Sequence, residues 1–260
     1  MDTKEIWKKT CKSICQIFHR KEGKIIGIGT GFKSSGFIIT NNHVYNPINS
    51  DEITISFKES NGINVTLSKK YTAEEFIKIL NRGMPQDSWD FAILNDSFFD
   101  KIPDLKLSSV ESVTEIGQDC VFLGFPLSSN YLSIHKAIVS AKYTNTKNEV
   151  KYIQLDASIN KGNSGGPLIN SETLEVIGIV TLKKTGFSDR FEGLNKSYQD
   201  NLNQFEQNKG MEIQMGNYEI GDAFTVIQHQ LKELSQEIER ANNVGIGFAF
   251  ELDEVRESLL

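Results

Sequence analysis

Residues 159–170 read Ile-Asn-Lys-Gly-Asn-Ser-Gly-Gly-Pro-Leu-Ile-Asn and contain a serine, Ser164, that is closely flanked by glycines. A serine is an effective nucleophile only where one group removes its proton and another stabilises the oxyanion that forms. Gly162 and Gly165 allow a tight turn in which the amides of Gly162 and Ser164 converge on one point. The apolar residues after Pro167 predict a buried strand. The alternative is a glycine-rich β-turn whose serine only satisfies local backbone groups, and the motif alone does not separate the two.

The candidate general base is His43, which follows the apolar stretch at residues 36–40 and two asparagines. It stands where a strand meets small polar residues, so its side chain can be both held in place and exposed. The other three histidines have simpler interpretations, in a strand-like stretch, on a strand surface and on a predicted helix: His19, His135 and His229. A lone histidine is more often structural than catalytic, so the assignment of His43 depends on its partners.

The candidate partner of the histidine is Asp90, at the start of the apolar run 91–94. A partly buried carboxylate can accept the Nδ1 proton of a histidine, which fixes the tautomer and stabilises the imidazolium. Asp87 is the rival carboxylate, but it lies in a polar loop further from the strand and is expected to be solvated. The chain order His, Asp, Ser matches the chymotrypsin arrangement and differs from the subtilisin and α/β-hydrolase orders.

Five further stretches of sequence, in this order along the chain, carry a family resemblance. They are residues 29–32 with 40–44, residues 90–94, residues 117–126, residues 153–167 and residues 244–250. Together they resemble the protease domain of the HtrA (DegP-like) branch of the trypsin-like serine proteases, and no PDZ domain is expected within the 260 residues.

The resemblance implies a mostly-β, chymotrypsin-like fold of two antiparallel six-stranded β-barrels, with a helical insertion and a short C-terminal helix. The expected domains are a barrel at residues 1–107 that carries His43 and Asp90, and a barrel at residues 108–260 that carries Ser164. The resemblance also implies a serine endopeptidase that hydrolyses peptide bonds through an acyl-enzyme. Periodicity alone supports only an all-β chain with helical additions.

Two positions bear on specificity and activation. Ser158 stands six residues before the nucleophile, where trypsins carry the acid that binds basic side chains. The substrate is expected to pair with the strand at Val180, Thr181 and Leu182, with Leu182 crowding the pocket, so small or aliphatic residues are expected at the cleavage site rather than Arg or Lys. Asn163 replaces the aspartate that pairs with a newly cut N-terminus in digestive trypsins, so activation of that type is not expected.

Composition and charge are those of an ordinary globular protein, with 38% hydrophobic and 24% charged residues. The net charge of −6 argues against a nucleic-acid or anionic-membrane surface. The N-terminal residues are interrupted by lysines and contain no signal-peptide core, and no apolar run reaches the length of a membrane span. The three cysteines are odd in number and are expected to be small buried thiols: Cys11, Cys15 and Cys120. These observations predict a cytoplasmic protein.

No cofactor is expected. The histidines, cysteines and carboxylates show no metal-ligand spacing. The glycines of residues 27–31 predict a strand with close backbone approach rather than a dinucleotide fingerprint. The expected partner is a protein or peptide substrate, with no nucleic acid and no membrane.

Short alternating runs predict strands in the first half of the chain at residues 14–19, 24–32, 36–40, 52–57 and 90–94. A second β region spans residues 113–182 and resumes at residues 244–250. Thr72 and Glu75 form a capping-box pattern that predicts a helix ending at Gly83. The expected apolar face of this helix is Phe76, Ile77 and Leu80. Residues 253–260 predict a short closing helix.

Residues 183–243 form an insertion where relatives have a short loop. Apolar residues at three- and four-residue spacing predict a helix of about five turns. They are Phe224, Ile227, Leu231, Leu234 and Ile238. A shorter helix is expected at Tyr198, Leu202 and Phe205, and a strand at Met211, Ile213 and Met215. The long stripe is expected to pack against the protein's own barrel; the alternatives are a docking or self-association helix and a gate over the cleft.

Three functions from different classes follow. An active endopeptidase is favoured, because the three catalytic residue types and the oxyanion glycines are all present. A catalytically silent trypsin-like module that binds proteins is the second. The third is a component of a larger assembly, in which a regulatory protein or self-association through the 183–243 insertion opens the site.

Overall fold

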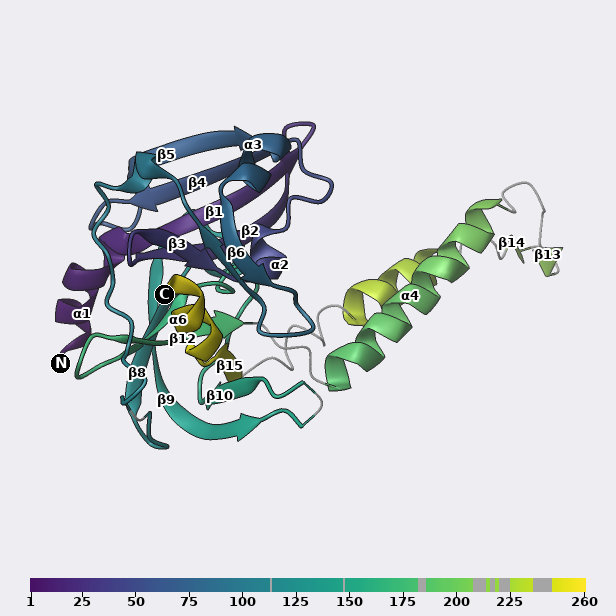
Figure 1. Ribbon diagram of the computed structural model, residues 1–260. Helices are drawn as coiled ribbons and strands as arrows, with labels where there is room; N and C mark the ends of the chain where they lie inside the picture. Colours follow the sequence, from purple (N-terminus) through teal and green to yellow (C-terminus); the bar gives the residue numbers. More distant parts are fainter. Residues whose placement is uncertain are drawn as a thin grey trace. The chain divides into compact units, whose positions relative to one another are not determined.

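The computed structural model describes residues 1–112, 114–146, 148–181, 186–207, 214–215, 218–219, 225–235 and 245–260. These residues form two compact units, Met1–Leu182 with Gly245–Leu260, and Lys183–Val244. The first unit holds two β structures, with helices at both ends of the chain (Figure 1). The described residues of the second unit are mainly helical.

The first β structure is an antiparallel sheet of seven strands in the order β5-β4-β1-β2-β3-β7-β6. Its strands are β1 (Ile14–Lys21), β2 (Lys24–Ser34), β3 (Phe37–Thr40), β4 (Glu52–Lys58), β5 (Val65–Thr72), β6 (Leu80–Met84) and β7 (Phe91–Leu94). Five of these strands were predicted within a few residues, whereas β5 and β6 were not. The single turn α2 (Asn42–Tyr45) directly follows β3.

The second β structure is a closed antiparallel barrel of six strands in the order β10-β15-β12-β11-β8-β9. Its strands are β8 (Asp119–Gly124), β9 (Ser133–Thr144), β10 (Lys151–Leu155), β11 (Pro167–Asn170), β12 (Val176–Thr181) and β15 (Gly247–Phe250). The helix α6 (Asp253–Leu259) follows β15 as predicted.

The predicted mostly-β class and one six-stranded barrel are confirmed. The other predicted barrel is corrected to a seven-stranded sheet, in which the edge strands β5 and β6 of the described chain do not pair with each other. The additional strand is β6, which extends the sheet beyond β7 with a register shift between Leu80 and Arg82. The sequence pattern predicts the end of a helix for these residues, which the structure corrects to a strand.

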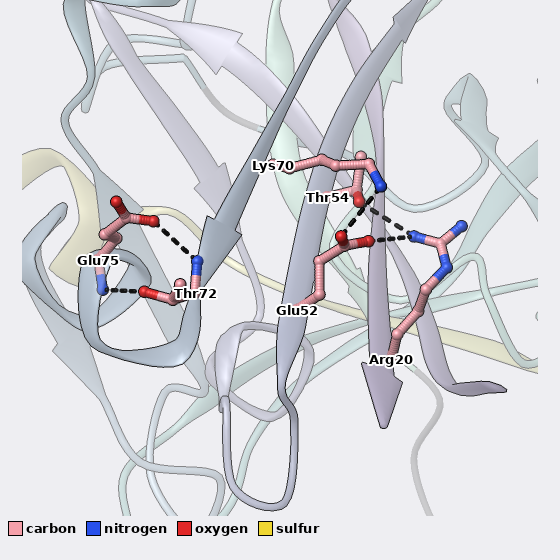
Figure 2. Close-up of polar contacts among 6 residues, drawn as sticks. All are labelled: Arg20, Glu52, Thr54, Lys70, Thr72 and Glu75. Atoms are coloured by element: carbon pink, nitrogen blue, oxygen red, sulfur yellow. Dashed lines mark hydrogen bonds and ion pairs between the residues drawn. The ribbon is translucent and has the colours of Figure 1, made fainter. Parts of the chain in front are cut away.

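The helix α3 (Ala73–Lys78) begins at the predicted capping box. The amide of Glu75 donates to the Thr72 hydroxyl at 3.2 Å, and the amide of Thr72 donates to the Glu75 carboxylate at 2.8 Å (Figure 2). The helix ends earlier than predicted because Leu80–Met84 pairs with β7. Phe76 is fully buried, but Ile77 is 54% exposed and does not share its face.

Figure 2 also shows an ion-pair group across three neighbouring strands of the first sheet. Glu52 on β4 lies 3.3 Å from Arg20 on β1 and 2.9 Å from Lys70 on β5. Arg20 also donates to the Thr54 hydroxyl at 3.0 Å. These ion pairs connect three neighbouring strands and favour this strand register.

Each β structure has a buried cluster of its own, and a third hydrophobic cluster is shared between them. Phe32 and Phe91 of the first sheet belong to the same buried cluster as Val121 and Ile169 of the barrel. The N-terminal helix α1 (Thr3–Thr10), which was not predicted, contributes Ile6 to the shared cluster. The C-terminal segment contributes Leu252 and Val255. This common core holds loops from the two β structures against each other.

The second unit contains α4 (Gly186–Gln207), a helical stretch at residues 225–235, and the short pair β13 (Gln214–Met215) and β14 (Tyr218–Glu219). Asn201 donates to Gln228 at 3.4 Å and Lys232 donates to Gln199. Residue numbers fall from 201 to 199 along α4 while those of their partners rise from 228 to 232. The two helices therefore run antiparallel. The predicted short helix at Tyr198, Leu202 and Phe205 is therefore one part of a longer one.

The predicted apolar stripe of the second unit is described only in part. Ile227, Leu231 and Leu234 are 47%, 37% and 53% exposed. Phe224, Ile238, Met211 and Ile213 lie outside the described residues.

Within the described part of the chain, none of the helices combines the length and the apolar character that crossing a membrane requires.

Candidate active site

His43 and Asp90 form a direct pair in the first sheet. His43 lies on α2 after β3, and Asp90 comes directly before β7; β3 and β7 are neighbouring strands, with Thr40 opposite Ala92. The ring Nδ1 of His43 lies 2.7 Å from Oδ2 of Asp90, and the backbone amide of His43 donates to Oδ1 at 3.0 Å. Because an ionised carboxylate only accepts, Nδ1 carries the proton and Nε2 is left as the acceptor.

Asp90 is held in an unusual backbone conformation, with φ of 44°. Its side chain is shielded, since the residue is 1% exposed. Its amide donates to the carbonyl oxygen of Pro85 at 3.1 Å, and its own carbonyl accepts from the Asn41 side chain at 2.8 Å. A non-glycine residue in the left-handed region costs on the order of 1 kcal/mol or more and persists only where its surroundings fix it. The rival carboxylate, Asp87, is exposed as expected.

Ser164 lies in the loop between β10 and β11 and is 4% exposed. This loop packs against the first sheet. The amide of Thr30 on β2 donates to the carbonyl oxygen of Ser164 at 2.9 Å. A Cβ added to Gly165, which has φ of 86°, would lie 2.1 Å from the carbonyl oxygen of Thr30 and 3.1 Å from the amide of Asn41. The residue after Ser164 therefore lies against the segment that carries His43, two positions beyond Asn41.

Gly162 also needs to be a glycine. Its φ is 100°, and an added Cβ would lie 2.1 Å from the carbonyl oxygen of Phe125. Its amide donates no hydrogen bond to any of the described residues. Since a buried or half-buried amide normally has a partner, this amide is available to a ligand oxygen.

Two of the residues predicted to set specificity, Ser158 and Val180, make hydrogen bonds to backbone groups of neighbouring loops. The Ser158 hydroxyl accepts a hydrogen bond from the amide of Gly245 at 2.8 Å. The amide of Val180 donates to Gly166 and its carbonyl accepts from Gly165, both at 2.8 Å. Val180 therefore holds the nucleophile loop, and Thr181 pairs with Phe248 of β15.

Thr181 is 4% exposed. Leu182 lies outside the described residues.

Two of the other described histidines, His19 and His135, serve the fold. His19 Nε2 lies 2.7 Å from the carbonyl oxygen of Val44 and Nδ1 lies 3.1 Å from the Ser50 hydroxyl. The ring of His135 stacks on Phe122 with centroids 4.7 Å apart, so this residue is half-buried rather than a simple surface residue. Burial lowers the pKa of both histidines, with the hydrogen bond to Val44 opposing this shift in His19.

Sequence reasoning did not single out Thr30 or Asn41, which contact the candidate site directly. Both are fully buried polar residues at 0% exposure. Thr30 alternates with glycines in a strand, and Asn41 stands beside another asparagine, so neither differs visibly from ordinary strand and turn residues. Thr30 could have been found as a polar residue within an otherwise apolar strand. Such a residue needs a hydrogen-bond partner when it is buried.

Solved structures of HtrA-type proteases have a similar fold. The serine endoprotease from Yersinia pestis aligns with a TM-score of 0.54 and 25% identity, over 71% of this chain and 59% of that chain. An HtrA-type protease solved with a tripeptide aligns with a TM-score of 0.55 and 23% identity, over 69% of this chain and 54% of that chain, which shows the fold alone.

Curated relatives are named probable periplasmic serine endoproteases, DegP-like. The one from Pseudomonas putida (strain F1) is 30% identical over 164 residues, which cover 62% of this chain and 30% of the relative. The one from Hahella chejuensis is 34% identical over 161 residues, which cover 61% and 30%. The chain therefore spans less than a third of the length of these relatives.

The cytoplasmic location predicted from the sequence is wrong by this comparison, since these relatives are named periplasmic. One part of that prediction was the interpretation of the cysteines. All three thiols are free and buried, and a buried free thiol packs as a small hydrophobic side chain in either kind of compartment. The cysteines therefore carried no information about location.

The trypsin-like peptidase domain family matches residues 27–179, which is more than half of the chain. This span runs from β2 into β12 and includes His43, Asp90 and Ser164. The chain therefore belongs to the trypsin-like peptidase domain family, and its relatives are serine endoproteases of the HtrA (DegP-like) type.

Proposed function

We propose that this protein is a serine endopeptidase that cleaves protein or peptide substrates with a triad of Ser164, His43 and Asp90. The observation that carries the proposal is the His43–Asp90 pair at 2.7 Å, with the loop of Ser164 packed against the segment that leads into His43. Membership of the trypsin-like peptidase domain family supports the same assignment.

In the proposed mechanism, Nε2 of His43 takes the proton of the Ser164 hydroxyl as Oγ attacks the peptide carbonyl carbon. Asp90 keeps the proton on Nδ1 and stabilises the imidazolium that forms. His43 then gives its proton to the leaving amine, which departs as the new N-terminus. Water, activated by the same imidazole, hydrolyses the acyl-enzyme and restores Ser164.

The amides of Gly162 and Ser164 are the proposed oxyanion hole. Gly162 supports this role because its amide has no acceptor among the described residues. Loss of one such donor lowers kcat by about 10²- to 10³-fold in serine proteases, so the orientation of the amide contributes substantially to the rate.

Small or aliphatic residues are the proposed preference at the cleavage site. Ser158 brings no negative charge to the position before the nucleophile loop, and its hydroxyl is already bound to Gly245. Thr181 and Leu182 are the residues proposed to pair with the acyl side of the substrate. A peptide library should show cleavage after Ala, Val or similar residues, and a strict preference for Arg or Lys would reject this pocket.

The experiment that tests the activity compares hydrolysis of an unfolded protein substrate by the natural chain and by Ser164→Ala. Turnover by the natural chain and none by the variant, with unchanged circular dichroism, is the expected result. Equal turnover by both would reject Ser164 as the nucleophile. No turnover by either would favour the alternative of a catalytically silent or partner-gated binding module.

A regulatory protein or a second copy of the chain is proposed to bind through the 183–243 insertion. This segment forms a compact unit of its own. It exposes Val226, Ile227 and Leu234 by 47% to 55%. Light scattering of the natural chain and of Ile227→Glu measures self-association directly, and a monomer in both samples would remove the second copy from the proposal.

A further inference from the structure

Thr30 on β2 is fully buried, and its hydroxyl contacts two loops of the barrel. The Thr30 Oγ1 donates to the carbonyl oxygen of Gly162 at 2.7 Å and accepts from the amide of Phe125 at 3.2 Å. A hydroxyl has one hydrogen and the Phe125 amide can only donate, so the direction of both hydrogen bonds is fixed. One side chain of the first sheet thus ties together two loops of the barrel.

The amide of Gly162 belongs to the peptide unit that joins Lys161 to Gly162. The carbonyl of that same peptide accepts from the amide of Leu127 at 2.8 Å. The next peptide unit, from Gly162 to Asn163, is held by Thr30 through its carbonyl. Because each peptide is planar, fixing its carbonyl oxygen fixes the direction of its N–H. Leu127 therefore sets the direction of the Gly162 amide, and Thr30 fixes the peptide that follows it.

The loop that carries Leu127 depends in turn on the first sheet. Its beginning is held by Thr30 through Phe125, and Gln16 Nε2 donates to the carbonyl oxygen of Ser129 at 2.8 Å. Gln16 and Thr30 are opposite each other in the β1–β2 register, and both are 0% exposed. Leu127 has φ of 55°, a conformation that a non-glycine residue keeps only where its surroundings fix it.

We propose that Thr30 is a positioning residue for the oxyanion hole, an inference that rests on the proposed serine endopeptidase function. Its hydroxyl acts on the Gly162 amide through neighbouring groups. It holds the carbonyl of the next peptide, Gly162–Asn163, and through Phe125 it holds the loop whose Leu127 amide binds the Lys161 carbonyl. The contribution is made by the hydroxyl and not by the bulk of the side chain. The methyl group of Thr30 packs near Gly166, since a Cβ added to Gly166 would lie 3.3 Å from Cγ2 of Thr30.

The test compares Thr30→Val with Thr30→Ser. Valine keeps the shape of threonine and removes the hydroxyl, whereas serine keeps the hydroxyl and removes the methyl. Thr30→Val should lower kcat by about 10- to 100-fold, a part of the effect of losing an oxyanion donor. The KM should stay nearly unchanged, because the lost interaction acts only in the transition state. Thr30→Ser should retain most of the activity.

Thr10→Val is the matched control. The Thr10 hydroxyl is also buried and donates to the carbonyl oxygen of Ile6 at 2.8 Å, at the end of α1. This variant makes the same chemical change and should leave kcat unaltered. A peptide aldehyde gives a second measurement, because its hemiacetal oxygen occupies the oxyanion hole. Thr30→Val should weaken the aldehyde by the same factor as kcat.

Hydrogen exchange provides a measurement that needs no turnover. Thr30→Val should speed amide exchange in residues 125–132 and 160–166, and Thr10→Val should not. Unchanged kcat and unchanged exchange in Thr30→Val would overturn the proposal, as would a kcat loss that Thr30→Ser shares in full. If the natural chain itself has no turnover, the proposed function fails, and the exchange result alone supports or overturns the role of Thr30.

Discussion

The carboxylate of Asp90 binds His43 twice, through the ring Nδ1 at 2.7 Å and through the backbone amide at 3.0 Å. The first contact sets the tautomer of the ring and the second fixes the position of the residue that carries it. A carboxylate that served only as the counter-ion of the imidazolium would not need the second contact, to the backbone amide. The pair is therefore built for orientation, and it depends on Asp90 being held at φ of 44°.

Asp90→Asn should lower kcat by about 10⁴-fold, because an amide can donate to Nδ1 and so favours the wrong tautomer. The measurement is steady-state hydrolysis of a peptide substrate, with circular dichroism to verify the fold. Asp87→Asn is the control, since Asp87 is an exposed carboxylate three residues away. A loss of similar size in both variants would contradict the assignment of Asp90.

Gly162→Ala should abolish turnover and destabilise the fold. The added Cβ would lie 2.1 Å from the carbonyl oxygen of Phe125, so the loop must move. Gly117→Ala is the control, because Gly117 has a similar φ of 90° but nothing within 4 Å of the added Cβ. Backbone strain alone should cost Gly117→Ala about 1–2 kcal/mol in the free energy of unfolding and leave kcat unchanged. Equal effects of the two substitutions on kcat would argue against a special role of the Gly162 amide.

Stability should fall as the pH is lowered from 7.5 to 5.5. Burial lowers the pKa of His19 and His135 below the value of 6.5 expected for an unfolded histidine. Below about pH 6.5 the unfolded chain therefore binds protons that the folded chain resists, and the free energy of unfolding decreases. Urea unfolding at the two pH values measures this change.

His19→Gln should reduce this pH dependence, because glutamine can donate to Val44 and accept from Ser50 without titrating. His135 should account for the remainder. A pH dependence that is identical in the natural chain and in His19→Gln would show that His19 does not take part.

Much of the fold follows from local patterns. The strands around Ile17, Ile39 and Ile93 alternate or run apolar, and the Thr72–Glu75 capping box begins a helix as predicted. β6 was missed because residues 80–84 contain Asn81 and Gly83, which have low strand propensity. Pairing with the fully apolar β7 overrides that propensity. The N-terminal helix was missed because only Ile6 of its residues is a buried hydrophobic anchor.

The candidate site was predictable where the residue type limits the chemistry and was missed where only position matters. His43, Asp90 and Ser164 are chemically distinctive residues at strand ends. Thr30 is an ordinary strand residue whose role comes from register, since it lies opposite Gln16 and reaches Gly162, more than one hundred positions along the chain. A contact of that kind depends on how two β structures pack, which local sequence does not encode.

Reaction with a fluorophosphonate probe, followed by mass spectrometry of the labelled peptide, tests the central claim most directly. Such a probe forms a covalent bond only with a serine whose proton is removed and whose oxyanion is stabilised. One adduct on Ser164 in the natural chain, and none in Ser164→Ala or His43→Ala, is the predicted result. An unlabelled natural chain, or an adduct on a different residue, would contradict the catalytic triad.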